Sequence, residues 1–255
     1  MGQYTTQAIV VGVHNWGDAD KMVTFMTKEH GKVKAAAYGC RRPKSPLAAG
    51  MQMFNYLELQ LTEGQRLDTV KQYSLKKSFK AISADLTVMA YASFVAELAR
   101  ELCPEREPHP EVFAKLLEVL ESLSKRNPRI AALIAGYQLL EYTGCQLSFS
   151  RCVHCGEPIE GDRFFSLEQG GAVCGKCGFP GIDEFPETLR FFIEEMLAFD
   201  WQAQLSLRVN GAQLVRAERL LLLYLQHLLT RPLKSLAFIE QLSLLQPEGK
   251  KVAGR

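Results

Sequence analysis

The first eighty residues carry hydrophobic side chains in short runs or at every second position, which is the pattern of β-strands. The clearest case is Leu57, Leu59 and Leu61, which alternate with polar residues. Five strands without an intervening long helix favour a small closed barrel of the OB type. The strands are predicted at residues 8–13, 22–27, 33–37, 57–61 and about 67–75.

After Ser83 the apolar spacing changes to three and four residues, which indicates amphipathic helices. Ser83 or Asp85 can cap the first helix, and Gly144 suits the C-terminal end of the third. The polar tail from Gln246 is expected to fray. Helices are predicted at residues 86–102, 113–123, 130–142, 186–197 and 214–229. The pattern therefore predicts an α+β chain of two domains, an OB-type barrel over residues 1–80 followed by an all-α domain over residues 81–255.

Two Cys-x-x-Cys motifs interrupt the helical pattern. Cys152 and Cys155 form the first, and Cys174 and Cys177 form the second. Four thiolates complete the tetrahedral coordination of Zn²⁺, so this spacing indicates a structural zinc rather than a catalytic one. A hairpin between the motifs would bring them together. We expect one structural Zn²⁺ per chain, in a module over residues 150–182 that is inserted in the helical domain.

Disulfides or four unrelated thiols are the alternatives to zinc. The N-terminal residues lack the basic and apolar segments of a secretory signal, and the seven cysteines are an odd number. We expect Cys40, Cys103 and Cys145 to be small buried residues in a reducing cytoplasm. His154 lies between two predicted ligands and is expected at the surface. No run of eighteen apolar residues suggests a membrane span.

Charge is unevenly distributed along the chain. The net charge is +2, yet residues 1–80 hold twelve Lys and Arg against six Asp and Glu. A basic barrel favours an anionic partner such as DNA, and the alternative is a basic surface that is merely solvated. The predicted DNA contacts are Lys32, Lys34, Arg41, Arg42, Lys44, Lys71, Lys76 and Lys77. Tyr38 and Tyr73 could stack on bases, unless they are half-buried barrel residues.

Catalytic motifs are absent from the sequence. It contains no phosphate-binding P-loop, no Gly-x-Ser-x-Gly elbow and no His-Glu-x-x-His zinc helix. Asp18 and Asp20 could hold a metal, but a solvated turn with an Asx hydrogen bond is favoured. Two other classes stay open. A zinc-ribbon transcription or translation factor would contact nucleic acid through the cysteine module, whose flanks are acidic, and a DNA-processing enzyme would need metal-binding carboxylates.

The order of these motifs resembles the RecO family of bacterial DNA repair and recombination proteins. The similar stretches are 8–11, Gly17-Asp-Ala-Asp20, Thr27-Lys-Glu-His-Gly-Lys32, Gly39-Cys-Arg-Arg-Pro-Lys-Ser45, 57–59, Leu139-Leu-Glu-Tyr-Thr-Gly144, 152–156 and 165–177. The resemblance implies a non-enzymatic mediator that binds single- and double-stranded DNA and anneals complementary strands. It also implies association with RecR, contact with single-strand-binding protein, a functional link to the RecA recombinase, and a nucleoid-associated location in the cytoplasm.

Overall fold

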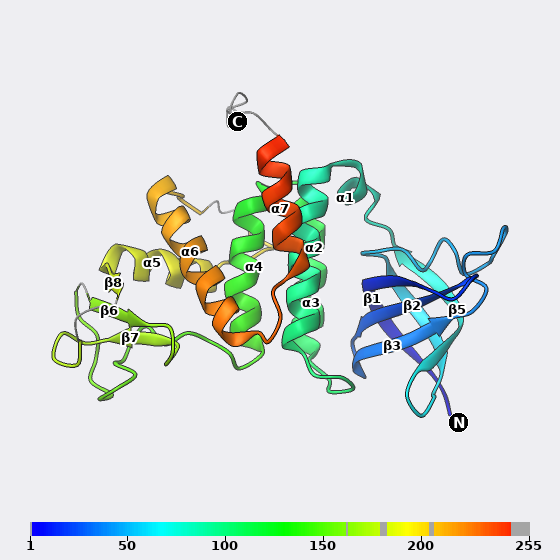
Figure 1. The fold of residues 1–255 in the computed structure, drawn as a ribbon, viewed down its shortest axis with the longest axis horizontal. Helices are drawn as coiled ribbons and strands as arrows, with labels where there is room; N and C mark the ends of the chain where they lie inside the picture. The colour runs from blue at the N-terminus through cyan, green and yellow to red at the C-terminus, as the bar shows by residue number, and fades with distance from the viewer. Residues whose placement is uncertain (1, 162, 179–182, 204–206, 246–255) are drawn as a thin grey trace.

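The structure is a computed structural model that describes residues 2–161, 163–178, 183–203 and 207–245. The molecule is elongated, with a β-barrel at one end, long helices in the middle and a small sheet at the other end (Figure 1). Asp162 and the polar tail predicted from Gln246 lie outside the described residues. The α+β arrangement predicted from the sequence is confirmed.

The barrel closes in the strand order β1-β2-β3-β5-β4. Its strands are β1 (Gln3–Trp16), β2 (Asp20–Thr27), β3 (Gly31–Ala37), β4 (Tyr56–Thr62) and β5 (Asp68–Lys77). The five predicted strands are confirmed, but β1 is longer than residues 8–13, because its polar first half pairs with β4 and its second half with β2. The parallel contact of β3 with β5 closes the ring. Phe25 and the alternating Leu57, Leu59 and Leu61 fill the interior.

The helical part begins directly after the barrel. Its helices are α1 (Lys80–Ala84), α2 (Leu86–Leu102), α3 (Pro110–Leu123), α4 (Pro128–Tyr142), α5 (Glu187–Leu197), α6 (Gly211–Leu228) and α7 (Lys234–Leu245). Asp85 caps α2 as predicted, since its carboxylate accepts from the amides of Thr87 and Val88. The helices α1 and α7 were not predicted. No helix within the described residues is long and apolar enough to cross a lipid bilayer.

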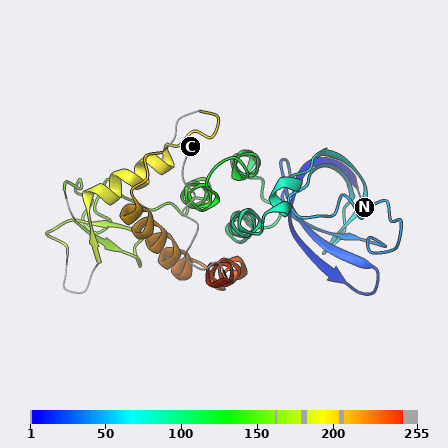
Figure 2. The same cartoon turned by 90° about the horizontal axis from the view of Figure 1, so that it is seen from above.

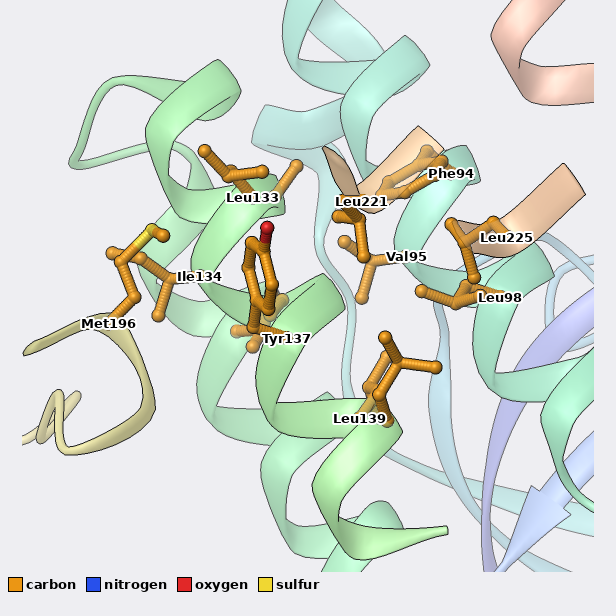
Figure 3. Close-up of a cluster of buried hydrophobic side chains, with 14 of the residues drawn as sticks. Phe94, Val95, Leu98, Leu133, Ile134, Tyr137, Leu139, Met196, Leu221 and Leu225 are labelled. Atoms are coloured by element: carbon orange, nitrogen blue, oxygen red, sulfur yellow. The ribbon is translucent and has the colours of Figure 1, made fainter. Parts of the chain in front are cut away.

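The core of the helical part lies where α2, α4 and α6 meet. Figure 3 shows Phe94, Val95 and Leu98 from α2 facing Leu133 and Tyr137 from α4, with Leu221 and Leu225 from α6 beside them. Tyr137 is fully buried, and its hydroxyl donates to the Ala217 carbonyl at 2.8 Å. The helices therefore form one apolar core in which this buried hydroxyl has a partner.

One buried amide joins α4 to the end of α5. Gln138 is 2% exposed, and its Nε2 donates to the carbonyls of Met196, Leu197 and Phe199 at 3.1, 3.2 and 2.9 Å. Its Oε1 accepts from the Trp201 indole N–H at 2.7 Å. The carbonyls at a helix C-terminus have no partners within the helix, so Gln138 supplies the hydrogen bonds that α5 cannot make internally.

The barrel packs on α2 and α3 through a shared apolar core. Ile9, Val11 and Met26 on the barrel belong to the same buried cluster as the helices, and both views place the barrel against these helices (Figure 2). The core of the molecule is thus continuous from the barrel wall into the helical part.

The linker between α2 and α3 holds the end of the barrel. Arg106 has a φ of 61°, its Nη2 lies 2.6 Å from the buried Asp68 Oδ1, and its amide donates to the Lys32 carbonyl at 3.0 Å. The backbone of Gly31 packs directly against the backbone of this linker. A Cβ at this position would lie 1.8 Å from the Glu107 carbonyl oxygen, so no larger side chain fits. We call this contact the linker clasp, and it fixes the barrel against the helices.

Candidate metal centre and nucleic-acid interface

The cysteine motifs lie on a small three-stranded sheet in the order β7-β6-β8. The predicted hairpin is β6 (Arg163–Ser166) and β7 (Gly171–Val173), with Phe164 opposite Val173. A third strand, β8 (Asp183–Phe185), follows the predicted end of the module at residue 182. Because β6 and β7 are antiparallel, Cys174 returns to the side of the sheet where Cys152 enters.

The four predicted ligands converge on one point. The Sγ atoms of Cys152, Cys155, Cys174 and Cys177 all lie within 4.8 Å of one another, and those of Cys155 and Cys174 are 3.6 Å apart. Four sulfurs at 2.3 Å from a tetrahedral ion would be about 3.8 Å apart. The four thiols could therefore hold one metal ion.

Backbone amides favour the thiolate form of Cys152. The Cys174 amide donates to Cys152 Sγ at 3.3 Å, and the Gly156 amide, on a residue with a φ of 77°, closes the first turn on the Cys152 carbonyl. Burial raises the pKa of Cys152, but donation from the amides of Cys174, Cys155 and His154 outweighs it and lowers the pKa to about 6. A thiolate is the form that binds a metal.

The surroundings of this site suit a structural role. Cys152 and Cys174 belong to the same buried cluster as the helical core, and Phe165 and Phe185 pack with ring centroids 5.3 Å apart. His154 is exposed as predicted. Cys40 and Cys103 are buried as expected, whereas Cys145 is only half-buried. Four thiols fill all the positions around a tetrahedral metal ion, so no coordination position is left for a substrate.

The loop between β3 and β4 presents the predicted cations Arg41, Arg42 and Lys44, all of which are exposed. Asp20 fixes the start of the loop, because its Oδ1 accepts from the Gly39 amide at 2.7 Å. The amide of Arg41 donates to the Ala19 carbonyl at 2.8 Å. The carboxylate of Asp20 thus bonds to the distant loop, whereas the Asx hydrogen bond expected for the acidic turn would be made within the turn itself. We refer to Arg41, Arg42 and Lys44 as the loop cations.

Two exposed aromatic residues lie beside this loop. Trp16 is 43% exposed and Tyr38 is 55% exposed, and their ring centroids are 6.1 Å apart. Trp16 was not predicted as a site residue. The sequence signal is its position at the end of β1, since the hairpin pairs it with Asp20 and so places it near Gly39. Exposed aromatic rings beside cations can stack on bases while the cations bind phosphates.

Three of the other five predicted cations contact the helical part and are not free beside the loop cations. Lys32 Nζ donates to the Arg100 carbonyl at 2.6 Å, Lys34 pairs with Glu105, and Lys77 pairs with Glu121 of α3. These three lysines contact the helical part, which corrects the expectation of a single shared face. Burial lowers the pKa of Lys32. Lys71 is exposed, and Lys76 pairs with Glu58 at 3.3 Å.

Tyr73 differs from Tyr38. It is half-buried and packs against the interior cluster of the barrel, with its ring over Gly50. This matches the alternative stated for it, a barrel residue rather than a stacking platform. Of the two candidate tyrosines, Tyr38 alone presents a largely exposed ring.

Comparisons with known proteins cover almost the whole chain. A family model described as "Recombination protein O N terminal" matches residues 1–79, and one described as "Recombination protein O C terminal" matches residues 83–237. The chain is 33% identical over 253 residues to the DNA repair protein RecO of Symbiobacterium thermophilum, covering 95% of this chain and 98% of the relative. It is 34% identical over 244 residues to that of Pelotomaculum thermopropionicum, covering 94% and 95%. The RecO of Desulfitobacterium hafniense is 35% identical over 182 residues, covering 71% of this chain and 67% of the relative.

Proposed function

Because the chain belongs to the recombination protein O family of DNA repair proteins, we propose that it binds single- and double-stranded DNA and anneals complementary strands without covalent chemistry. In this proposal it acts in the cytoplasm at the nucleoid, associates with RecR and single-strand-binding protein, and helps to load RecA. The division into residues 1–80 and 81–255, with a zinc module at 150–182, is part of the proposal.

The observation that carries the proposal is the exposed loop cations beside the Trp16 and Tyr38 rings. Cations on an irregular loop can neutralise phosphates and release counterions, which favours binding to any sequence. Aromatic rings add stacking that is also tolerant of sequence. A surface of this kind can hold one strand with its bases accessible, so that a complementary strand pairs with it.

We propose that the four cysteines hold Zn²⁺ and that its role is structural. When bound, the ion cross-links the two cysteine turns and so stabilises the small sheet. The cysteine module lies at the opposite end of the molecule from the barrel (Figure 1). The proposed DNA surface is therefore formed by the barrel, and the module supports the helical part.

A triple variant tests the DNA surface. Arg41→Ala with Arg42→Ala and Lys44→Ala should fold normally, because these side chains are exposed. Annealing of two complementary oligonucleotides should slow, and the slope of log K against log salt should flatten by up to about two units on single strands, at about 0.7 per neutralised phosphate. The assay is run with and without single-strand-binding protein, and binding is measured by fluorescence anisotropy.

The matched control removes the same charges elsewhere. Lys125, Arg216 and Arg219 are exposed on the helical part, so their triple alanine variant should keep the salt slope and the annealing rate of the wild type. If the loop variant also keeps them while remaining folded, the barrel loop is not the DNA site. Co-elution with RecR at micromolar concentration tests the partner separately, and separate elution would contradict that part of the proposal.

A further inference from the structure

A cavity of about 410 Å³ lies between the barrel and the helical part and shares no residue with the loop cations or the cysteines. Gly12 and His14 of β1 form one wall, Glu97 and Arg100 of α2 another, and Lys234 and Ser235 at the start of α7 a third. Arg231, just before α7, also lines it. We call this space the interdomain cavity.

The acidic groups of the cavity already have partners, and one arginine offsets part of their charge. Arg100 Nη2 lies 3.2 Å from Glu97 Oε1 and 3.1 Å from Glu101 Oε1. The second oxygen of Glu97 accepts from the Ser235 amide at 2.8 Å. Arg100 offsets one of the two carboxylate charges, so these three side chains together leave a single negative charge in the space.

The cations that remain are unpaired. Arg231 and Lys234 are exposed, and their side chains have no ion pair within the part of the chain that the structure describes. Arg100 reaches β1 as well, since a Cβ on Gly12 would lie 3.2 Å from its Nη1. The start of α7 adds the partial positive charge of a helix N-terminus. The cavity is therefore positive on balance.

A buried hydroxyl also lacks a partner here. Ser235 is 6% exposed, and its Oγ makes no hydrogen bond to any described residue. Buried polar groups in proteins nearly always have a partner, and an unsatisfied one needs an explanation. A ligand with acceptor oxygens would supply the partner, because a hydroxyl can donate to them.

We propose that the interdomain cavity binds a phosphate group, through Arg231, Lys234 and the hydroxyl of Ser235. The source of the phosphate could be a free anion or the backbone of a DNA strand, and we assign it to the backbone. That assignment rests on the proposed function. A strand held here passes along β1 from Gly12 toward Trp16, so the cavity adds a contact to the same strand that the loop cations bind.

The test uses the zinc-loaded full chain, labelled with ¹⁵N and titrated with inorganic phosphate and with a ten-residue oligothymidylate. Both probes should shift the amide resonances of Gly12, Ser235 and Leu236. The double variant Arg231→Ala with Lys234→Ala should abolish these shifts and flatten the salt slope for single strands by about 0.7 for each phosphate that it no longer neutralises. The control Lys125→Ala with Arg208→Ala removes the same charges from exposed positions. It should change neither the amide shifts nor the salt slope.

Each other outcome has a definite meaning. Shifts with inorganic phosphate alone would overturn the assignment to DNA and leave a site for free phosphate. No shift of these amides with either probe would overturn the cavity site altogether, even if the protein anneals DNA through the loop cations. If the cavity binds phosphate but the protein binds no DNA anywhere, the proposed function fails and the phosphate site stands.

A second variant separates a binding role of Ser235 from a structural one. Ser235→Ala removes a buried hydroxyl that has no partner, so the melting temperature should stay the same or rise. The phosphate concentration at half-saturation should rise about threefold to tenfold if one hydrogen bond to the ligand is removed. A lower melting temperature with unchanged phosphate affinity would instead show that the hydroxyl serves the fold, and would remove it from the site.

Discussion

A single side chain, Gln138, hydrogen-bonds to four polar groups at and just after the end of α5. Gln138→Ala should lower the free energy of unfolding by about 2 kcal/mol or more, because three carbonyls and an indole N–H each lose a hydrogen bond. Urea denaturation at neutral pH measures this change. The control Gln202→Ala removes an exposed glutamine nearby and should change stability by less than about 0.5 kcal/mol. Equal effects of the two variants would contradict the role given to Gln138.

The ionisation of a single residue, Asp68, should make the free energy of unfolding depend on pH. Burial raises the pKa of its carboxyl, but hydrogen bonds from Tyr4, the Gly64 amide and Arg106 outweigh burial and hold the pKa below its usual value. A lowered folded-state pKa gives stability that is present above about pH 4 and is lost as the pH falls through the folded value. Asp68→Asn should therefore cost about 2 kcal/mol at pH 7 and less at pH 3.

Urea unfolding at the two pH values measures this difference, with Asp18→Asn as the control because Asp18 is exposed. A difference in the free energy of unfolding between wild type and Asp68→Asn that stays constant from pH 7 to pH 3 would contradict this prediction. It would show that the shape of the side chain matters and its charge does not.

At the scale of an element, the proposed zinc would stabilise the small sheet. Cys152→Ser with Cys174→Ser should abolish metal binding and lower the melting temperature, since binding to a structural site is coupled to folding. Elemental analysis should find about one zinc per chain in the wild type and none in the variant. Cys145→Ser, which changes a cysteine outside the cluster, should keep the metal. A wild type that carries no metal and has the same stability as the double variant would contradict the zinc proposal.

The elements also show how far the sequence predicts the molecule. The period of two at Leu57, Leu59 and Leu61 and the paired cysteines could be recognised because each pattern depends on residues that lie close together in the sequence. The helix α7 was missed because its apolar residues do not form one stripe, and Leu244 is 84% exposed. Trp16 was missed because its exposure depends on where its strand ends.

The cations of the barrel were harder to predict for another reason. Lys32 and Lys34 alternate with buried residues. The sequence therefore predicts that their side chains point away from the barrel interior. What they meet there depends on the linker between α2 and α3, which is distant in the sequence. Periodicity identifies the outward face of a strand but not the element that covers it.

For the whole molecule, the difference between lysines that contact the helical part and the exposed loop cations can be tested. Lys34 and Lys77 already pair with Glu105 and Glu121, so they have less charge to offer a phosphate than the loop cations. Lys34→Ala with Lys77→Ala should leave the salt slope of DNA binding within about 0.3 of the wild type, against up to about two units for the loop variant. Stability should fall by no more than about 1 kcal/mol, since exposed ion pairs contribute little. A slope that falls by more than about one unit would return these lysines to the DNA surface.

The continuous core limits how the chain can be divided. Ile9, Val11 and Met26 belong to the same cluster as the helices, so a barrel cut away after β5 would carry an apolar patch on its outer wall. Such patches on isolated proteins promote self-association. A fragment prepared to study DNA binding alone would thus be prone to aggregate, and its apparent affinity would include that of its oligomers.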